Sequence, residues 1–166
     1  TDTEFVRALD IGIDELSHED EHSIEVQVPF IKYRFPRARI APVMMGDQSY
    51  AAATELGERI LAAIKKTRRD VRIVASSDFS HYVPEEKAKA DDLFAIEPLE
   101  HLDTQEFYRR IAERGVTACG YGPITAMVTA CAGLGASRGT LLKYMTSGDM
   151  SGDYAKVVGY AGIAVI

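Results

Sequence analysis

Residues 71–82 read Val-Arg-Ile-Val-Ala-Ser-Ser-Asp-Phe-Ser-His-Tyr. The first five residues are rich in β-branched side chains, and they predict a short strand over Val71–Ala75. The segment from Ser76 to His81 is polar apart from Phe79 and predicts a loop directly after that strand. Binding and catalytic groups of open α/β sheets gather in loops just past the strand ends. The stretch therefore indicates both an α/β fold and the place of a functional site.

Strands and helices are predicted to alternate on both sides of this stretch. Further strands are predicted at Arg39–Met45, Leu141–Met145 and Val157–Ile166. Helices are predicted at Glu21–Phe35, Tyr50–Lys66, Pro84–Ile96, Asp103–Gly115 and Pro123–Gly133, with capping groups at Ser49 and Asp103. This alternation predicts an α/β sandwich around one sheet.

The first residues fit this pattern less well. Thr1 to Val6 indicate neither a strand nor a capped helix, and such a start is typical of the interior of a larger domain. We therefore expect the sheet to end in an uncovered strand, or to be completed by another chain or by residues outside these 166.

Composition narrows the classes of partner. A length of 166 residues suits one domain with a sizeable core. The net charge of −6 argues against nucleic acid or an anionic membrane as a partner. No apolar run approaches the roughly 20 residues that span a bilayer. Two cysteines are too few for a disulfide scaffold, so we expect a reducing, cytoplasmic setting.

Three polar segments carry the chemistry. They are Glu21-His22-Ser23, the loop from Ser76 to His81, and Cys119-Gly120-Tyr121-Gly122-Pro123. Together they supply two imidazoles, a carboxylate and a thiol, which suits a mononuclear metal site or an acid/base site with a reactive cysteine. The predicted helix start after Cys119 favours the thiolate, which is the form that binds metals.

Each segment also has a simpler interpretation. Ser76 to His81 can be a turn with capping groups, and the absence of a Gly-x-Ser-x-Gly elbow disfavours a serine hydrolase. His22 can be a surface histidine, and Cys119 a small buried side chain. That second interpretation suits Cys131, which lies in the middle of a predicted helix.

Longer blocks around these residues resemble a known family. Residues 21–30, 76–82 and 118–124 resemble three blocks of the Memo (mediator of cell motility) family, and they occur in the family's order. Residues 146–149 and 158–161 resemble the C-terminal block of its prokaryotic members. The resemblance covers essentially the whole chain and implies one Memo-like domain over residues 1–166.

The resemblance implies a fold and a site. The fold would be a three-layer sandwich with a central mixed sheet flanked by helices, like that of class III extradiol dioxygenases, which use non-heme Fe(II). His22 and Cys119 match metal ligands of the family. His81 matches a pocket histidine that would act as general acid/base, and Asp78 matches the neighbouring carboxylate. The implied cofactor is Fe(II), or copper.

One family feature is missing. The resemblance implies a further ligand histidine in an N-terminal His-Ala-Gly motif, which this sequence lacks. The chain thus resembles the C-terminal part of a family member without roughly its first third, and we expect the metal site to be incomplete within it.

The resemblance also leaves two classes of function. The chain is either a metal-dependent redox or dioxygenase-like enzyme, or a non-catalytic module whose pocket receives a peptide or a protein. It implies a small-molecule or peptide ligand. Because prokaryotic members accompany a radical-SAM protein and an AMMECR1-like protein, an accessory role to such partners is a third interpretation.

Overall fold

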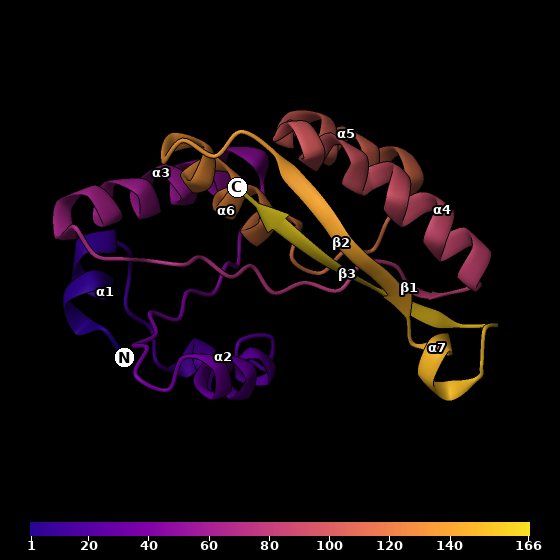
Figure 1. Ribbon diagram of the computed structural model, residues 1–166, viewed down its shortest axis with the longest axis horizontal. Coiled ribbons are helices and arrows are strands. Elements are labelled where there is room, and N and C mark those ends of the chain that lie inside the picture. The colour runs from indigo at the N-terminus through magenta and orange to yellow at the C-terminus, as the bar shows by residue number, and fades with distance from the viewer.

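A computed structural model describes residues 1–166 as helices packed around a small antiparallel sheet (Figure 1). The sheet has three strands in the order β1-β3-β2, with β1 at His81–Val83, β2 at Gly139–Thr146 and β3 at Val157–Val165. Both pairings are antiparallel. In the view of Figure 1, α4 and α5 run along one side of β2 and β3, while α2 and α7 lie on the other.

The helices follow the capping and apolar patterns of the sequence. They are α1 (Thr3–Leu9), α2 (Val28–Arg34), α3 (Tyr50–Thr67), α4 (Glu85–Ile96), α5 (Thr104–Arg114), α6 (Tyr121–Gly133) and α7 (Gly148–Ser151), with 3₁₀ turns η1 (Leu16–His18), η2 (Glu25–Gln27) and η3 (Glu97–His101). No helix joins the length to the apolar character that crossing a bilayer requires.

Several predicted helix ends are confirmed. The Ser49 hydroxyl accepts the amide of Ala52 at the start of α3. The Asp103 carboxylate accepts the amide of Glu106 at the start of α5. Gly115 ends α5 with a φ of 63°, a conformation that glycine adopts without strain.

Two separate apolar clusters hold these elements. The larger one joins α4, α5 and α6 to the sheet, and its most buried members include Phe79, Ile96, Phe107 and Val128. Leu141, Ala161, Ile163 and Val165 of β2 and β3 pack against it. The smaller cluster joins α1 to α3 through Phe5, Leu9, Ala63 and Ile64.

The structure corrects the sheet that the sequence indicated. The sheet is antiparallel rather than mixed, because Arg39–Met45 and Val71–Ala75 are extended but pair with no strand. β-Branched composition favours an extended backbone, whereas a strand also needs a hydrogen-bonded neighbour. The predicted strands near Leu141 and Val157 are confirmed as β2 and β3.

Two further expectations are wrong. The chain does begin with a capped helix, because the Asp2 carboxylate accepts the amide of Phe5 and starts α1. Helices do not flank both faces of the sheet, since Leu142, Lys143 and Tyr160 on the outward face of β2 and β3 are exposed. The three-layer arrangement is therefore absent among these residues.

A buried carboxylate on α4 ties the sheet to the helices. Asp92 is 0% exposed, and its Oδ1 accepts the Ser80 hydroxyl at 2.6 Å while its Oδ2 accepts the Tyr144 hydroxyl at 2.7 Å. Burial raises the pKa of Asp92 despite these hydrogen bonds. A Cβ on Gly159 would lie 2.1 Å from Oδ2, so only glycine fits there.

We predict that Asp92→Ala lowers the free energy of unfolding by about 2–3 kcal/mol, because it leaves the buried hydroxyl of Ser80 and the half-buried hydroxyl of Tyr144 unpaired. Asp92→Asn, which keeps an acceptor, should cost less. Chemical denaturation of both variants measures this. Equal losses would show that the hydrogen bonds of Asp92 matter little.

The Asp92→Asn variant also tests how the charge of Asp92 affects stability. Because the pKa of Asp92 is higher in the folded chain than in the unfolded one, its contribution to stability is complete below pH ~4 and is lost as pH rises through the folded pKa. Asp92→Asn should therefore lose less stability than the parent between pH ~4 and ~7. Parallel pH profiles would contradict this.

Candidate functional site

Hydrogen bonds join the loop before β1 to the segment before α6. The amide of Cys119 donates to the carbonyl oxygen of Asp78 at 3.2 Å. In return the amide of Asp78 donates to Cys119 Sγ at 3.1 Å, and the amide of Gly120 donates to Ser77 Oγ at 2.8 Å. The main chain thus places the thiol beside the carboxylate-bearing loop.

This approach depends on glycine. A Cβ on Gly120 would lie 2.6 Å from the carbonyl oxygen of Ser76 and 2.8 Å from Ser77 Cβ. Both neighbours are too close for any other residue without a shift of the backbone. The glycine of the Cys119-Gly120 pair is therefore a packing requirement of the site.

His81 is oriented by an irregularity in β1. The register of β1 against β3 shifts at Tyr82, whose φ of 59° is left-handed and strained for a residue with a side chain. The His81 amide donates to Thr117 Oγ1 at 2.8 Å, and its Nδ1 lies 2.9 Å from the Thr117 carbonyl oxygen. A carbonyl only accepts, so in neutral His81 the proton is on Nδ1.

The other ring nitrogen faces the carboxylate. His81 Nε2 lies 3.8 Å from Asp78 Oδ2, with 25% of the histidine side chain and 47% of the aspartate side chain exposed. In this tautomer Nε2 carries a free lone pair that can accept a proton. The structure thus brings together three of the four expected site residues, Asp78, His81 and Cys119.

The thiol is held differently from the sequence expectation. Cys119 is exposed, and its Sγ accepts from the Asp78 amide rather than from the first amides of α6. Gln48 occupies that helix start instead. Its Oε1 accepts the Gly122 amide at 2.9 Å, and its Nε2 donates to the Cys119 carbonyl oxygen at 2.9 Å.

His22 lies on a neighbouring segment. It is exposed and follows Glu21, whose carboxylate accepts the amides of Ser23 and Ile24. The next turn, η2, touches the loop before β1, because Gln27 Nε2 donates to Ser76 Oγ at 3.2 Å. The pairing of His22 with Cys119 on one ion stays a prediction.

The imidazole and thiol groups are of the types that bind metals, but there are too few of them for a complete site. Imidazole and thiolate suit iron, copper or zinc. Protein sites normally supply three or four ligands, and no group of three or more His, Cys, Asp or Glu side chains able to hold an ion forms among these 166 residues. Within this chain the ligand set is partial.

Sequence reasoning missed three residues that shape the site. Gln48 and Thr117 act through hydrogen bonds across long sequence separations, and no local pattern marks them. Burial, together with the charge of Asp78, raises the pKa of Tyr160, so its hydroxyl stays protonated near the pocket. The sequence pointed to the block of residues 158–161 that contains Tyr160, but not to the hydroxyl of Tyr160 itself.

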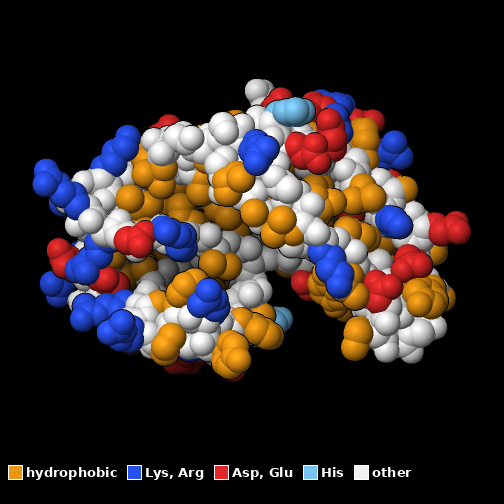
Figure 2. All heavy atoms as spheres, viewed as in Figure 1, with side chains coloured by type: hydrophobic (Ala, Val, Ile, Leu, Met, Phe, Trp, Pro, Cys, Tyr) orange, Lys and Arg blue, Asp and Glu red, His pale blue; other side chains and the backbone are white.

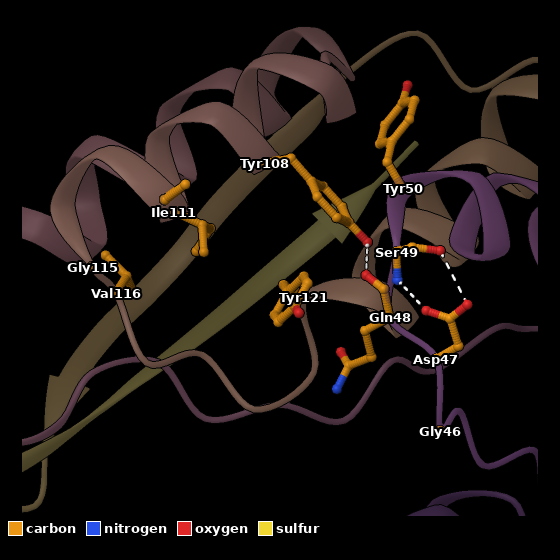
Figure 3. A pocket seen from close by; sticks show the side chains of 11 residues that line it. Gly46, Asp47, Gln48, Ser49, Tyr50, Tyr108, Ile111, Gly115, Val116 and Tyr121 are labelled. Carbon is orange, nitrogen blue, oxygen red and sulfur yellow. Dashed lines mark hydrogen bonds between the residues drawn. The ribbon is translucent and has the colours of Figure 1, made fainter.

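The surface of the molecule has two hollows. Figure 2 shows the surface hollowed between the lobe that holds α2 and the lobe that holds α7. A second, open hollow of about 640 Å³ is lined by residues that include Gln48, Tyr50, Tyr108 and Tyr121 (Figure 3). Tyr108 stands between Tyr50 and Tyr121 there, each ring edge-on at 5.2 Å.

Comparisons with known proteins identify the family of the chain. The sequence model of the Memo family, described as "Memo-like protein", matches residues 1–164. A MEMO1 family protein of Methanococcoides burtonii is 48% identical over 156 residues, which are 93% of this chain and 59% of the relative. One of Methanosarcina mazei is 49% identical over 93% of this chain and 58% of the relative.

A more distant match reaches further along the chain. A MEMO1 family protein of Methanocaldococcus jannaschii is 40% identical over 99% of this chain and 60% of the relative. The chain spans about three-fifths of the length of these curated relatives. On the family model and on these identities, the chain belongs to the Memo family.

Proposed function

We propose that this chain supplies part of a metal-dependent redox site. Cys119 and His22 would be metal ligands, and His81 with Asp78 would move a proton beside the metal. Fe(II) is the proposed metal, with copper as the alternative. A relation of the whole fold to class III extradiol dioxygenases belongs to the same proposal.

The position of Cys119 Sγ carries this proposal. The sulfur is exposed and accepts the Asp78 amide at 3.1 Å. The sulfur therefore lies at the surface beside the loop that carries Asp78, where an ion can reach it. Cys131 differs, because burial raises the pKa of its thiol and keeps it protonated.

His81 and Asp78 supply the proton chemistry. Nδ1 is committed to the Thr117 carbonyl oxygen, so Nε2 is the atom that gains and loses a proton. Asp78 Oδ2 lies 3.8 Å from Nε2, so the carboxylate faces the nitrogen at which the proton would be exchanged. A quarter of the His81 side chain is exposed, so a substrate could bring its acidic proton to this nitrogen.

A bound metal would supply electron transfer or activation of O₂, which no side chain of this chain provides. Because the chain's own ligand set is partial, the proposal requires at least one further ligand from outside these residues or from water. Thiolate in place of the usual carboxylate also makes catechol cleavage an improbable reaction.

Substitution of the two cysteines tests the metal role. In an anaerobic calorimetric titration with Fe(II), Cys119→Ser should weaken binding by ~10–100-fold or more, since even second-shell changes cost that much. Cys131→Ser is the matched control and should leave affinity unchanged. Equal affinities in the two variants would refute Cys119 as a ligand, provided both unfold at the parent's temperature.

The tautomer of His81 is a second test. In ¹⁵N-histidine-labelled protein at high pH, NMR should show a protonated Nδ1 and an unprotonated Nε2 for His81. His101, which is exposed, serves as the internal comparison and should average both tautomers. A proton found on Nε2 of neutral His81 would remove it as the base.

One observation favours a second function, the binding of a peptide or protein. Around α2, four large apolar side chains are strongly exposed, namely Val26, Phe30, Tyr33 and Phe35, with Tyr33 at 91%. Exposed apolar clusters of this kind mark interaction surfaces. They lie near the pocket, since Gln27 contacts Ser76.

We expect Tyr33→Ser to leave Fe(II) affinity unchanged and to weaken any bound protein partner at least ~10-fold, as for an interface aromatic. Partner binding that survives chelation of the metal but fails in Tyr33→Ser would favour the binding module over the enzyme. Loss of partner binding on chelation alone would favour the metal site.

A further inference from the structure

The side chain of Gln48, in the turn before α3, bonds to residues 71 and 74 positions further along the chain. Its Nε2 donates to the Cys119 carbonyl oxygen at 2.9 Å, and its Oε1 accepts the Gly122 amide at 2.9 Å. A carboxamide turned the other way would set donor against donor and acceptor against acceptor. The two bonds therefore require a group that donates on one side and accepts on the other, as glutamine does.

The peptide group between Cys119 and Gly120 is held at both of its polar ends. Its C=O, which belongs to Cys119, accepts from Gln48 Nε2, and its N–H, which belongs to Gly120, donates to Ser77 Oγ at 2.8 Å. In a planar trans peptide these two groups point in opposite directions, so Gln48 and Ser77 lie on opposite sides of it. Rotation of this one peptide group would break both bonds.

This peptide group needs such support because a glycine follows it. Gly120 must lack a side chain, since a Cβ there would lie 2.6 Å from the Ser76 carbonyl oxygen. Glycine has the widest choice of backbone conformations, so a peptide group beside it rotates more easily than elsewhere. Packing thus requires the residue that restrains the backbone least, and the bond from Gln48 supplies the missing restraint.

Gln48 is itself held in place. The Tyr108 hydroxyl donates to the Gln48 carbonyl oxygen at 2.9 Å (Figure 3). Burial raises the pKa of that hydroxyl to about 12, so it remains a donor. The methylene groups of Gln48 pack on Gly122, where a Cβ would lie 3.0 Å from both Gln48 Cβ and Cγ. The carboxamide therefore reaches Cys119 from a fixed base.

We propose that Gln48 is a positioning residue for Cys119. Its carboxamide holds the Cys119–Gly120 peptide group in the orientation that places Cys119 Sγ 3.1 Å from the Asp78 amide nitrogen. The inference deepens the proposed function and rests on it only for the role of Cys119 as a metal ligand. The position of the sulfur belongs to the chain without metal.

A simpler role for Gln48 is that of a helix cap. Gly120 precedes α6 and has no side chain that could cap it, so Gln48 Oε1 satisfies the Gly122 amide instead. Gln48→Glu separates the two roles. A carboxylate still accepts the Gly122 amide and suits a helix start, but it has no donor for the Cys119 carbonyl oxygen.

The test measures amide hydrogen exchange by NMR in the metal-free protein at its native length. In Gln48→Glu we expect the Gly120 and Asp78 amides to exchange about 3–10-fold faster than in the parent, the factor that one lost hydrogen bond gives. The Gly122 amide should keep its protection. Gln48→Leu, which has neither donor nor acceptor, should speed exchange at all three amides.

Two controls accompany these variants. Gln105→Glu makes the same change of charge at an exposed position of α5 and should alter none of the three amides. Cys119→Ala removes the sulfur and should by itself speed exchange at Asp78, because the Asp78 amide donates to Sγ.

Two results would overturn the proposal. Unchanged exchange at Gly120 and Asp78 in Gln48→Glu would show that Gln48 is only a cap. Unchanged exchange at Asp78 in Cys119→Ala would show that the sulfur is not held there.

A titration with Fe(II) separates this inference from the proposed function. If Cys119 is a ligand, Gln48→Leu should weaken Fe(II) binding about 10-fold or more, as loss of a group that orients a ligand does. A parent protein that binds no Fe(II) would refute the metal role, while faster exchange in Gln48→Glu would still support the positioning role. Faster exchange in Gln48→Leu with unchanged Fe(II) affinity would refute any effect of this position on the metal.

Discussion

The reciprocal hydrogen bonds between Asp78 and Cys119 are the constraint on which the site depends. They tie a loop and a segment 41 residues apart, and both use backbone amides, so the geometry does not rest on flexible side chains. Gly120 permits the approach because any Cβ there would strike the facing loop. Thr117, two residues before the thiol, then holds the ring of His81. One contact between two segments therefore sets the positions of a thiol, a carboxylate and an imidazole.

The packing beneath the site explains why this contact is stable. Phe79 and Ser80 are buried between Asp78 and His81, Phe79 in the larger apolar cluster and Ser80 on the carboxylate of Asp92. Two consecutive side chains thus point inward, which departs from the alternation of a regular strand, while Asp78 and His81 on either side remain partly exposed. Buried, well-packed side chains thus support the exposed polar groups of Asp78 and His81. Binding and proton transfer require such rigid support.

The metal proposal and the binding proposal rest on different groups of the molecule. The first rests on one sulfur and one imidazole, a number short of a coordination shell. The second rests on the exposed apolar side chains around α2. The hydrogen bond from Gln27 to Ser76 links the turn before α2 to the loop that carries Asp78.

The sequence by itself determined the helices α3 to α6, since caps at Ser49 and Asp103 and a glycine at 115 are local signals that act within one turn, but it did not indicate α1 or α7. It also determined β2 and β3, because both segments are short apolar runs of the kind that is typical of strands. It indicated Asp78, His81 and Cys119 because their residue types are chemically distinctive. Only the tertiary structure decided that Val71–Ala75 lacks a ladder, that Asp92 anchors the sheet, and that Gln48 and Thr117 serve the site. Pairing, burial and long-range hydrogen bonds depend on which segments become neighbours, and a local pattern carries no information about a neighbour 40 or more residues away.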